Sequence, residues 1–174
     1  MSEIAIRVRA IGQLFNSFDP SPFLEKDLDN DAEDYIVSWA RELPSDQPFS
    51  IVIHLPAKEA ETPEAASLAE AMANYFENRA RRFEHELREL FRIGWRSLAI
   101  GTTALVLCLA ASQLVSRLIP YPTTARIVEE SLILVGWVAN WRPIEIYLYD
   151  WWPIRRRLRL YRRIAQAPVE LVAT

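Results

Sequence analysis

The longest uninterrupted apolar pattern along the chain lies between Ser97 and Ser116. These twenty residues carry no charged side chain, and Arg96 and Arg117 flank them. A helix of this length rises about 30 Å, the thickness of the hydrocarbon core of a bilayer. A buried helix of a soluble protein is the alternative, but the rest of the chain is too small to enclose a helix that is apolar on every side. The pattern therefore predicts a transmembrane helix at residues 97–118.

A second apolar run begins after a short turn that contains two prolines, Pro120 and Pro122. Proline lacks a backbone N–H and cannot continue a helix, so we assign residues 119–125 to an external turn. Residues 126–149 are then long enough to return through the bilayer as a second transmembrane helix. The charge-free core of this run, residues 131–141, is only eleven residues long. A re-entrant or interfacial helix that does not cross is therefore the alternative for the second run.

If the two helices form an antiparallel hairpin, the sequence predicts which of their residues face each other. If the arginines beside the turn lie opposite each other, Gln113 faces Glu130, and Thr102 or Thr103 lies near Asn140. Polar groups in lipid need partners from a neighbouring helix, and this register supplies them. A stripe of small residues on the first helix would also let the second helix approach closely near Gly136. This stripe consists of Ala104, Cys108, Ser112 and Ser116.

Polar and charged residues within the predicted membrane helices are candidate functional positions, because burial in lipid makes them costly. Arg142 and Glu145 are three residues apart and can pair on one helix face. We expect such structural pairing, with a role in proton or ion passage as the alternative. The full set of candidate intramembrane polar residues is Gln113, Glu129, Glu130, Asn140, Arg142 and Glu145.

Aromatic and basic residues at the end of the second helix predict a lipid interface. Trp side chains favour the headgroup level of a bilayer, and arginines near it contact anionic headgroups and fix the topology. We therefore assign residues 150–174 to an Arg-rich cytosolic interfacial tail. The predicted anchors are Trp141, Trp151, Trp152, Arg155, Arg156 and Arg157.

The distribution of arginines predicts the orientation of the hairpin. Six arginines lie in residues 79–96, and six more lie in residues 155–163, whereas the turn between the helices has only Arg117 and Arg126 beside it. By the positive-inside rule both termini lie in the cytosol. The N-terminal residues also lack the apolar stretch of a signal peptide. We therefore expect a multi-pass protein of the bacterial inner membrane.

Residues 1–60 have the pattern of a small cytosolic β-α-β head. Ile4, Ile6 and Val8 alternate with polar residues, as do the apolar residues of 49–55, and both segments are predicted strands. The helix between them has Tyr35, Ile36, Trp39 and Ala40 at helical spacing. This order predicts two parallel strands with a right-handed crossover. Because two strands alone are marginal, we expect pairing with another subunit or cover from the next helix to complete the sheet.

A long amphipathic helix is predicted over residues 61–96. Thr62 can cap it, and Pro63 fits its first position. A seam at heptad spacing indicates a coiled-coil stalk that joins two or more copies, whereas packing of the same face on the chain's own head is the equal alternative. The seam consists of Ala69, Ala73, Phe76, Ala80, Phe83, Leu87, Leu90 and Gly94.

The charge distribution separates the two ends of the chain. Residues 1–60 contain eleven Asp and Glu against five Lys and Arg, whereas residues 101–174 contain nine Arg against five acids. The net charge of −3 hides this asymmetry. The arginine-rich end lacks a nucleic-acid-binding motif or a second basic face, so no nucleic-acid partner is predicted.

Catalytic and cofactor motifs are lacking in the sequence. The single cysteine, Cys108, excludes an internal disulfide and a cysteine zinc site. The four glycines are scattered and make no phosphate loop. His54 and His85 have no second ligand at a suitable spacing. We therefore expect no cofactor and no enzymatic activity.

The acidic segment of residues 25–34 is the candidate docking site for a partner. Its three alternate aspartates resemble the start of a calcium loop, but Ala32 and Ser38 stand where the EF-hand pattern has Gly and Glu. Capping of the next helix by Asp29 or Asn30 is the simpler interpretation, with metal binding as the alternative. The candidate docking residues are Phe18, Asp19, Phe23, Asp27, Asp29 and Asp31.

Together these patterns predict a membrane α-helical hairpin with both termini inside, a small cytosolic α+β head and a long helical stalk. The function that fits this architecture is a non-enzymatic oligomeric scaffold, regulatory subunit or anchor. Its partners would be the lipid bilayer, further copies of the chain and a cytosolic or membrane protein. The alternative is a subunit of an oligomeric ion channel or transporter with a polar pathway between hairpins.

Overall fold

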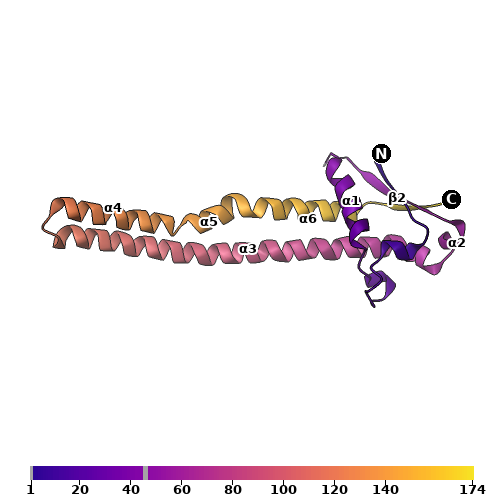
Figure 1. Cartoon of the computed structure of the whole chain (residues 1–174), viewed down its shortest axis with the longest axis horizontal. Coiled ribbons are helices and arrows are strands. Elements are labelled where there is room, and N and C mark those ends of the chain that lie inside the picture. The colour runs from indigo at the N-terminus through magenta and orange to yellow at the C-terminus, as the bar shows by residue number, and fades with distance from the viewer. Residues whose placement is uncertain (1, 45–46) are drawn as a thin grey trace. The chain divides into compact units, whose positions relative to one another are not determined.

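The computed structural model describes residues 2–44 and 47–174. It is mostly helical, with a small parallel sheet and one long apolar helix (Figure 1). The chain forms two compact units. The head comprises Met1–Glu84 and Arg156–Thr174, and the hairpin comprises His85–Arg155.

The sheet of the head has three parallel strands in the order β1-β2-β3. The parallel pairing of β1 with β2 confirms the prediction from the β-α-β pattern, with Ile4 beside Ile51. The third strand comes from the C-terminal end and places Leu171 beside Ile53. The chain therefore supplies the third strand itself, from the segment that we had assigned to an interfacial tail, where we had expected a strand from another subunit or cover from the next helix. The strands are β1 (Ser2–Arg7), β2 (Phe49–Leu55) and β3 (Val169–Ala173).

One face of this sheet carries the core of the head. Ile4, Ile51 and Ile53 are each at most 2% exposed and belong to one apolar cluster with residues from three helices. These three helices therefore lie on the same face of the sheet. The smaller elements of the head and its first full helix are η1 (Ile11–Leu14), η2 (Phe23–Glu25), α1 (Asn30–Glu42) and α2 (Ala57–Ala60).

Helix α1 turns a different face to the core from the one that its apolar pattern suggested. Ile36 and Ala40 are fully buried as expected, but Tyr35 is 43% exposed and Trp39 is 48% exposed. In their place the helix buries Glu33, whose side chain is needed inside the head. A buried carboxylate therefore fixes the rotation of this helix.

Helix α3 (Pro63–Leu118) runs unbroken for 56 residues. Thr62 caps it, because the backbone N–H of Ala65 donates to the Thr62 hydroxyl at 3.3 Å. Within the head, α3 buries Leu68, Met72 and Phe76 against the sheet, and the seam residue Ala69 is exposed. The helix thus packs on its own head, the alternative to a coiled-coil stalk.

The hairpin packs the second half of α3 against an antiparallel series of helices (Figure 1). A Cβ atom added at Gly136 would lie 3.1 Å from the Cβ of Cys108, the close approach predicted from the small-residue stripe. The Asn140 amide donates to the carbonyl of Gly101 at 3.0 Å, within one or two residues of the predicted register. The helical segments after the turn are α4 (Pro122–Val138), α5 (Trp141–Glu145), the π-helical segment η3 (Ile146–Asp150) and α6 (Trp151–Ala165).

The pattern of the second apolar run predicted one continuous helix, but the structure divides this run into several segments. It begins earlier than predicted, with Pro122 in the first turn, and it breaks at residues 139–140. Pro143 has no N–H with which to bond the carbonyl of Ala139, and its ring crowds that carbonyl. The chain therefore turns before α5 and then passes through a π-helical segment.

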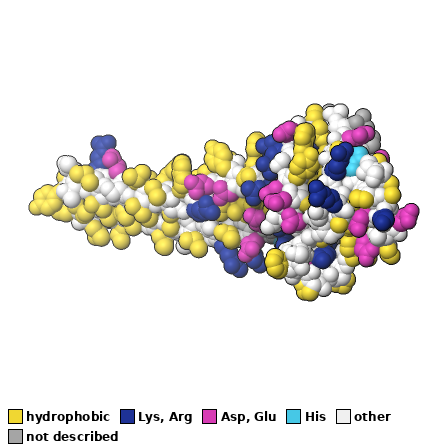
Figure 2. Space-filling view, turned by 45° about the vertical axis from the view of Figure 1, so that its right-hand side comes forward, with side chains coloured by type: hydrophobic (Ala, Val, Ile, Leu, Met, Phe, Trp, Pro, Cys, Tyr) yellow, Lys and Arg dark blue, Asp and Glu magenta, His cyan; other side chains and the backbone are white. Residues whose placement is uncertain are grey.

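The hairpin exposes an unusually apolar surface. Over 18 residues of α3 the mean hydropathy is 2.0, yet only 11% of that stretch is buried. Figure 2 shows hydrophobic side chains over most of the visible face of this unit. By length and composition, α3 is the one helix in the described part of the chain that is able to cross a membrane. Helix α4 has 17 residues, so two complete spans are not shown.

Substitution of Gly136 by Leu tests the packing of α3 against α4. The new side chain would meet Leu105 and Cys108 at contact distances of 2.9 to 3.1 Å. Overpacking of this kind costs about 1–3 kcal/mol. We expect hydrogen–deuterium exchange of the α4 amides to accelerate by about ten- to a hundred-fold. Gly12→Ala is the control, because a Cβ there has nothing within 4 Å; equal exchange in the two variants would contradict the packing.

Candidate functional site

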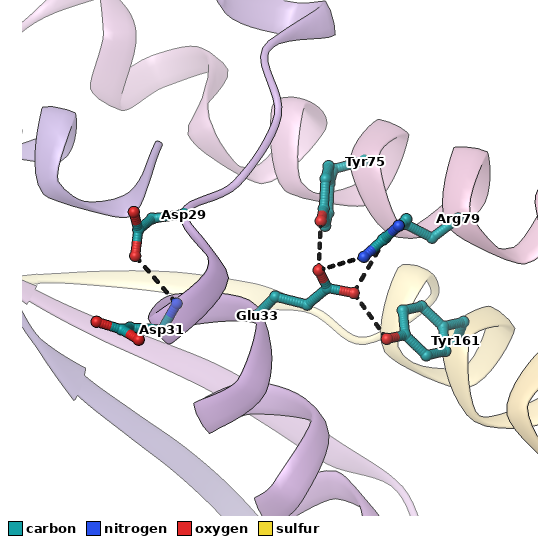
Figure 3. A network of polar contacts seen from close by, with 6 residues as sticks. All are labelled: Asp29, Asp31, Glu33, Tyr75, Arg79 and Tyr161. Carbon is teal, nitrogen blue, oxygen red and sulfur yellow. Dashed lines mark hydrogen bonds and ion pairs between the residues drawn. The ribbon is translucent and has the colours of Figure 1, made fainter. Parts of the chain in front are cut away.

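The most connected polar site of the described chain surrounds the carboxylate of Glu33 (Figure 3). Glu33 is 4% exposed. It accepts hydrogen bonds from the hydroxyls of Tyr75 at 2.6 Å and Tyr161 at 2.7 Å. The Arg79 guanidinium donates to both carboxylate oxygens, at 3.1 and 2.7 Å. These donors come from α3 and α6, so one side chain of α1 joins three helices.

The electrostatics of this site keep the carboxylate charged. Burial alone would raise the pKa of Glu33, but the hydrogen bonds from Arg79, Tyr75 and Tyr161 outweigh it and lower that pKa. Burial and the bonds to Glu33 raise the pKa of both Tyr75 and Tyr161, so both remain protonated donors. A charged carboxylate with four hydrogen bonds has little capacity left to accept a proton. The arrangement is therefore suited to holding helices together rather than to acid–base catalysis.

This site was not found in the sequence. In the sequence, Glu33 is one of several acids in the segment of residues 25–34, and Arg79 is one of six arginines in residues 79–96. No local spacing connects Glu33 with Tyr161, which is 128 residues further along the chain. An acidic residue at helical spacing from Ile36 and Ala40 was the one available signal, since it lies on the apolar face.

The acidic segment forms a capped turn, as the simpler interpretation predicted. The Asp29 carboxylate accepts from the backbone N–H of Asp31 at 3.0 Å and caps α1. The Asp19 carboxylate accepts from the backbone N–H groups of Ser21 and Asp27, at 3.0 and 2.7 Å. These bonds, with that from Asp27 first, lower the pKa of Asp19. Residues 2–44 and 47–174 contain no group of three His, Cys, Asp or Glu side chains placed to hold a metal ion.

The two aromatic residues of the candidate docking segment behave differently. Phe23 packs against Phe15, with ring centroids 4.8 Å apart. Phe18 is 93% exposed at the tip of the loop. The structure thus presents Phe18 at the surface and gives Phe23 a structural role beside Phe15.

The candidate intramembrane polar residues fall into pairs and single positions. Arg142 contacts Glu145 at 3.3 Å, as predicted, and also Asp150 at 3.0 Å. Glu145 accepts a further bond from the Trp141 indole at 2.9 Å. Asn140 donates to the carbonyls of Gly101 and Gly136, both at 3.0 Å.

The polar residues near the turn lie apart from that group. Arg126 pairs with Glu130 at 2.9 Å on the surface of α4, and Glu129 lines a hollow beside them. Gln113, which we had expected opposite Glu130, is exposed on α3. The hairpin therefore brings together Asn140 and Gly101.

Five of the six predicted interface anchors lie in the first half of α6, and Trp141 lies at the start of α5. The rings of Trp151 and Trp152 are 6.0 Å apart and nearly perpendicular, and the Arg155 guanidinium lies 5.5 Å from the Trp151 ring centre. Arg156 and Arg157 are both exposed. The aromatic and basic residues thus form one continuous surface segment of the chain.

Comparison with protein-family models, with curated proteins and with solved structures finds no significant match to this chain.

Replacement of Glu33 by Gln tests the role of its carboxylate. The change removes the charge that pairs with the partly buried Arg79, and we expect the head to lose about 2–4 kcal/mol of stability. Hydrogen–deuterium exchange of the β2 amides measures this loss. Glu77→Gln is the matched control, because Glu77 forms only a surface pair with Arg81 at 3.5 Å, which is worth at most about 1 kcal/mol. Equal effects of the two substitutions would contradict a stabilising role for the buried site.

The same variants predict the effect of acid. Because the pKa of Glu33 is lower in the folded head than its ordinary value of 4.5, its contribution is fully present above about pH 4.5 and is lost as the pH falls through the folded-state value. The wild-type head should therefore lose more stability on acidification than the Glu33→Gln head. Parallel acid dependence of the two proteins would show that another group is responsible.

Proposed function

We propose that this chain is a membrane-anchored, non-enzymatic scaffold or regulatory subunit that holds its α/β head at the cytosolic side of a bacterial inner membrane. The exposed apolar surface of the hairpin is the observation that carries the proposal. A soluble protein would bury a helix as apolar as the second half of α3, whereas lipid is a solvent in which this surface is stable.

Membrane insertion also accounts for the polar groups of the hairpin. In the proposed two-span topology, Asn140, Arg142 and Glu145 lie close to the cytosolic interface, and their mutual and backbone hydrogen bonds lower the cost of the lipid boundary. The helix break before α5 is then placed at the interface, where water or headgroups reach the free backbone groups. Trp151 and Trp152 follow at headgroup level.

The face of the sheet opposite the core cluster supports the oligomeric part of the proposal. Parallel sheets are normally covered on both faces, but the core cluster contains residues from one face only. On the other face the outer strands expose Ala5, Arg7 and Glu170 beside Val52 of the central strand. The opposite charges of Arg7 and Glu170 suit a second copy of the same face, turned by a two-fold rotation. We therefore propose that two heads associate through this face.

Cysteine labelling tests the proposed topology. Tyr121, in the turn before α4, is 72% exposed, and Lys58 is exposed on α2 of the head. In a Cys108→Ser background, we expect a membrane-impermeant maleimide to label a Tyr121→Cys variant in intact spheroplasts. A Lys58→Cys variant should be labelled only after permeabilisation. Labelling of both positions before permeabilisation, or of neither, would contradict the two-span arrangement.

Disulfide crosslinking in native membranes tests the proposed association. A double variant with Ala5→Cys and Glu170→Cys in the same background should form a dimer on oxidation, because the two-fold rotation that pairs Arg7 with Glu170 also lays β1 of one copy against β3 of the other. Lys58→Cys is the matched control and should crosslink far less. Comparable crosslinking of the two variants would remove the sheet face as the interface. Ion flux through liposomes containing the pure protein, abolished by Glu130→Ala with Arg142→Ala, would instead favour the channel.

A further inference from the structure

A hollow of about 820 Å³ in the head is lined by five arginines, and no acidic residue of the described ranges 2–44 and 47–174 lines it. Arg41 comes from the last turn of α1, and the other four come from α6. Cations that lie close together repel one another, and this repulsion is stronger where solvent is partly excluded. The remaining lining consists of Ala40, Leu43, Leu160 and Gln166.

Two of the five arginines are held in place by other parts of the head. The Arg162 guanidinium donates to the Glu84 carboxylate at 2.7 Å. The Arg163 guanidinium donates to the carbonyl of Gln47 at 2.6 Å and lies 4.9 Å from the ring centre of Phe49. These contacts fix the charges on one side of the hollow without neutralising more than one of them.

The other three arginines have no ion pair or side-chain hydrogen bond within residues 2–44 and 47–174: Arg41, Arg156 and Arg159. Some arginines elsewhere in the chain are paired instead. Arg79, Arg92, Arg126 and Arg142 each contact a carboxylate. Arg156, Arg159 and Arg163 are spaced by three and four residues, so they share one face of α6. Arg41 is brought to the same hollow because Tyr161 of α6 is bonded to Glu33 of α1.

We propose that this hollow is a binding site for a phosphate group. A guanidinium donates two parallel hydrogen bonds to a phosphate, and its planar charge matches that of the anion. Arg41 on one side and Arg156 and Arg159 on the other can donate to different oxygens of one phosphate, while Arg162 and Arg163 add charge. Leu43 and Leu160 cover the apolar stems of these side chains.

The phosphate has two sources, an anionic phospholipid headgroup and a soluble phosphate compound. The headgroup is favoured by the position of Trp151 and Trp152 immediately before the arginines in α6. This lipid source rests on the proposed membrane anchorage, whereas binding of a soluble phosphate does not. An experiment can therefore disprove membrane anchorage without disproving phosphate binding, and the reverse.

Binding is tested on the full chain in nanodiscs. One set contains phosphatidylcholine alone and is titrated with inorganic pyrophosphate. The second set contains phosphatidylcholine with phosphatidylglycerol, and native mass spectrometry measures the phosphatidylglycerol that remains bound after the discs are dissolved in detergent. Arg156→Gln with Arg159→Gln should reduce binding of the true ligand at least tenfold, and Arg41→Gln should reduce it in the same direction.

Arg81→Gln with Arg82→Gln is the charge-matched control, because both residues are exposed on α3 and neither lines the hollow. Loss of phosphatidylglycerol in the hollow variants alone supports the lipid source. Loss of pyrophosphate binding in the hollow variants alone supports the soluble source. Equal loss in the control pair, or no binding of either probe to the wild type, would overturn the site. Arg41→Gln, on a different helix, guards against misfolding of α6 as the explanation.

Discussion

The head depends on a single buried charge. Removing a carboxylate from water costs several kcal/mol, and in Glu33 this cost is offset by donors that arrive from two other helices. The bonds form only when α1, α3 and α6 have one particular rotation and depth on the sheet. An apolar contact would tolerate sliding of these helices, whereas a carboxylate with four bonds does not. The charge therefore selects one packing of the three helices.

The same contact determines which charges meet at the surface of the head. Because Tyr161 is bonded to Glu33, the arginines of α6 on the neighbouring face lie opposite Arg41 of α1. The ring of Tyr161 also lies 5.0 Å from that of Phe83, which adds apolar contact between α6 and α3. One tyrosine thus connects the buried carboxylate, the apolar core and the arginine-lined hollow. The geometry of the hollow is a consequence of the core beneath it.

Local patterns in the sequence were sufficient for the elements with strong periodicity. The paired strands β1 and β2, the Asp29 cap and the Thr62 cap of α3 were all predicted, because each depends on neighbouring residues. The close approach at Gly136 was predicted from four small residues at regular spacing. All of these features depend on residues that are close in the sequence or that lie in elements connected directly along the chain.

The parts that were missed depend on contacts between distant residues. The strand β3 has five residues and exposes most of its side chains, so its alternation is weak. It becomes a strand because it pairs with β2, which lies more than a hundred residues earlier in the chain. The exposure of Tyr35 and Trp39 followed from the burial of Glu33, a choice that depends on Tyr161. Without the distant partner, burial of two aromatic residues was the reasonable expectation.

The hairpin explains how strands that are far apart in the sequence can form so small a sheet. Two strands are marginal without a third, and the third is separated from them by most of the chain. The hairpin removes much of the entropic cost of this closure. At its open end the rings of Phe91 and Tyr147 stack with centroids 6.0 Å apart, and Ile146 packs against Gly94. The chain therefore leaves the hairpin close to where it entered it. Only α6 and a short connection then separate that point from β3, so a formed hairpin favours completion of the sheet.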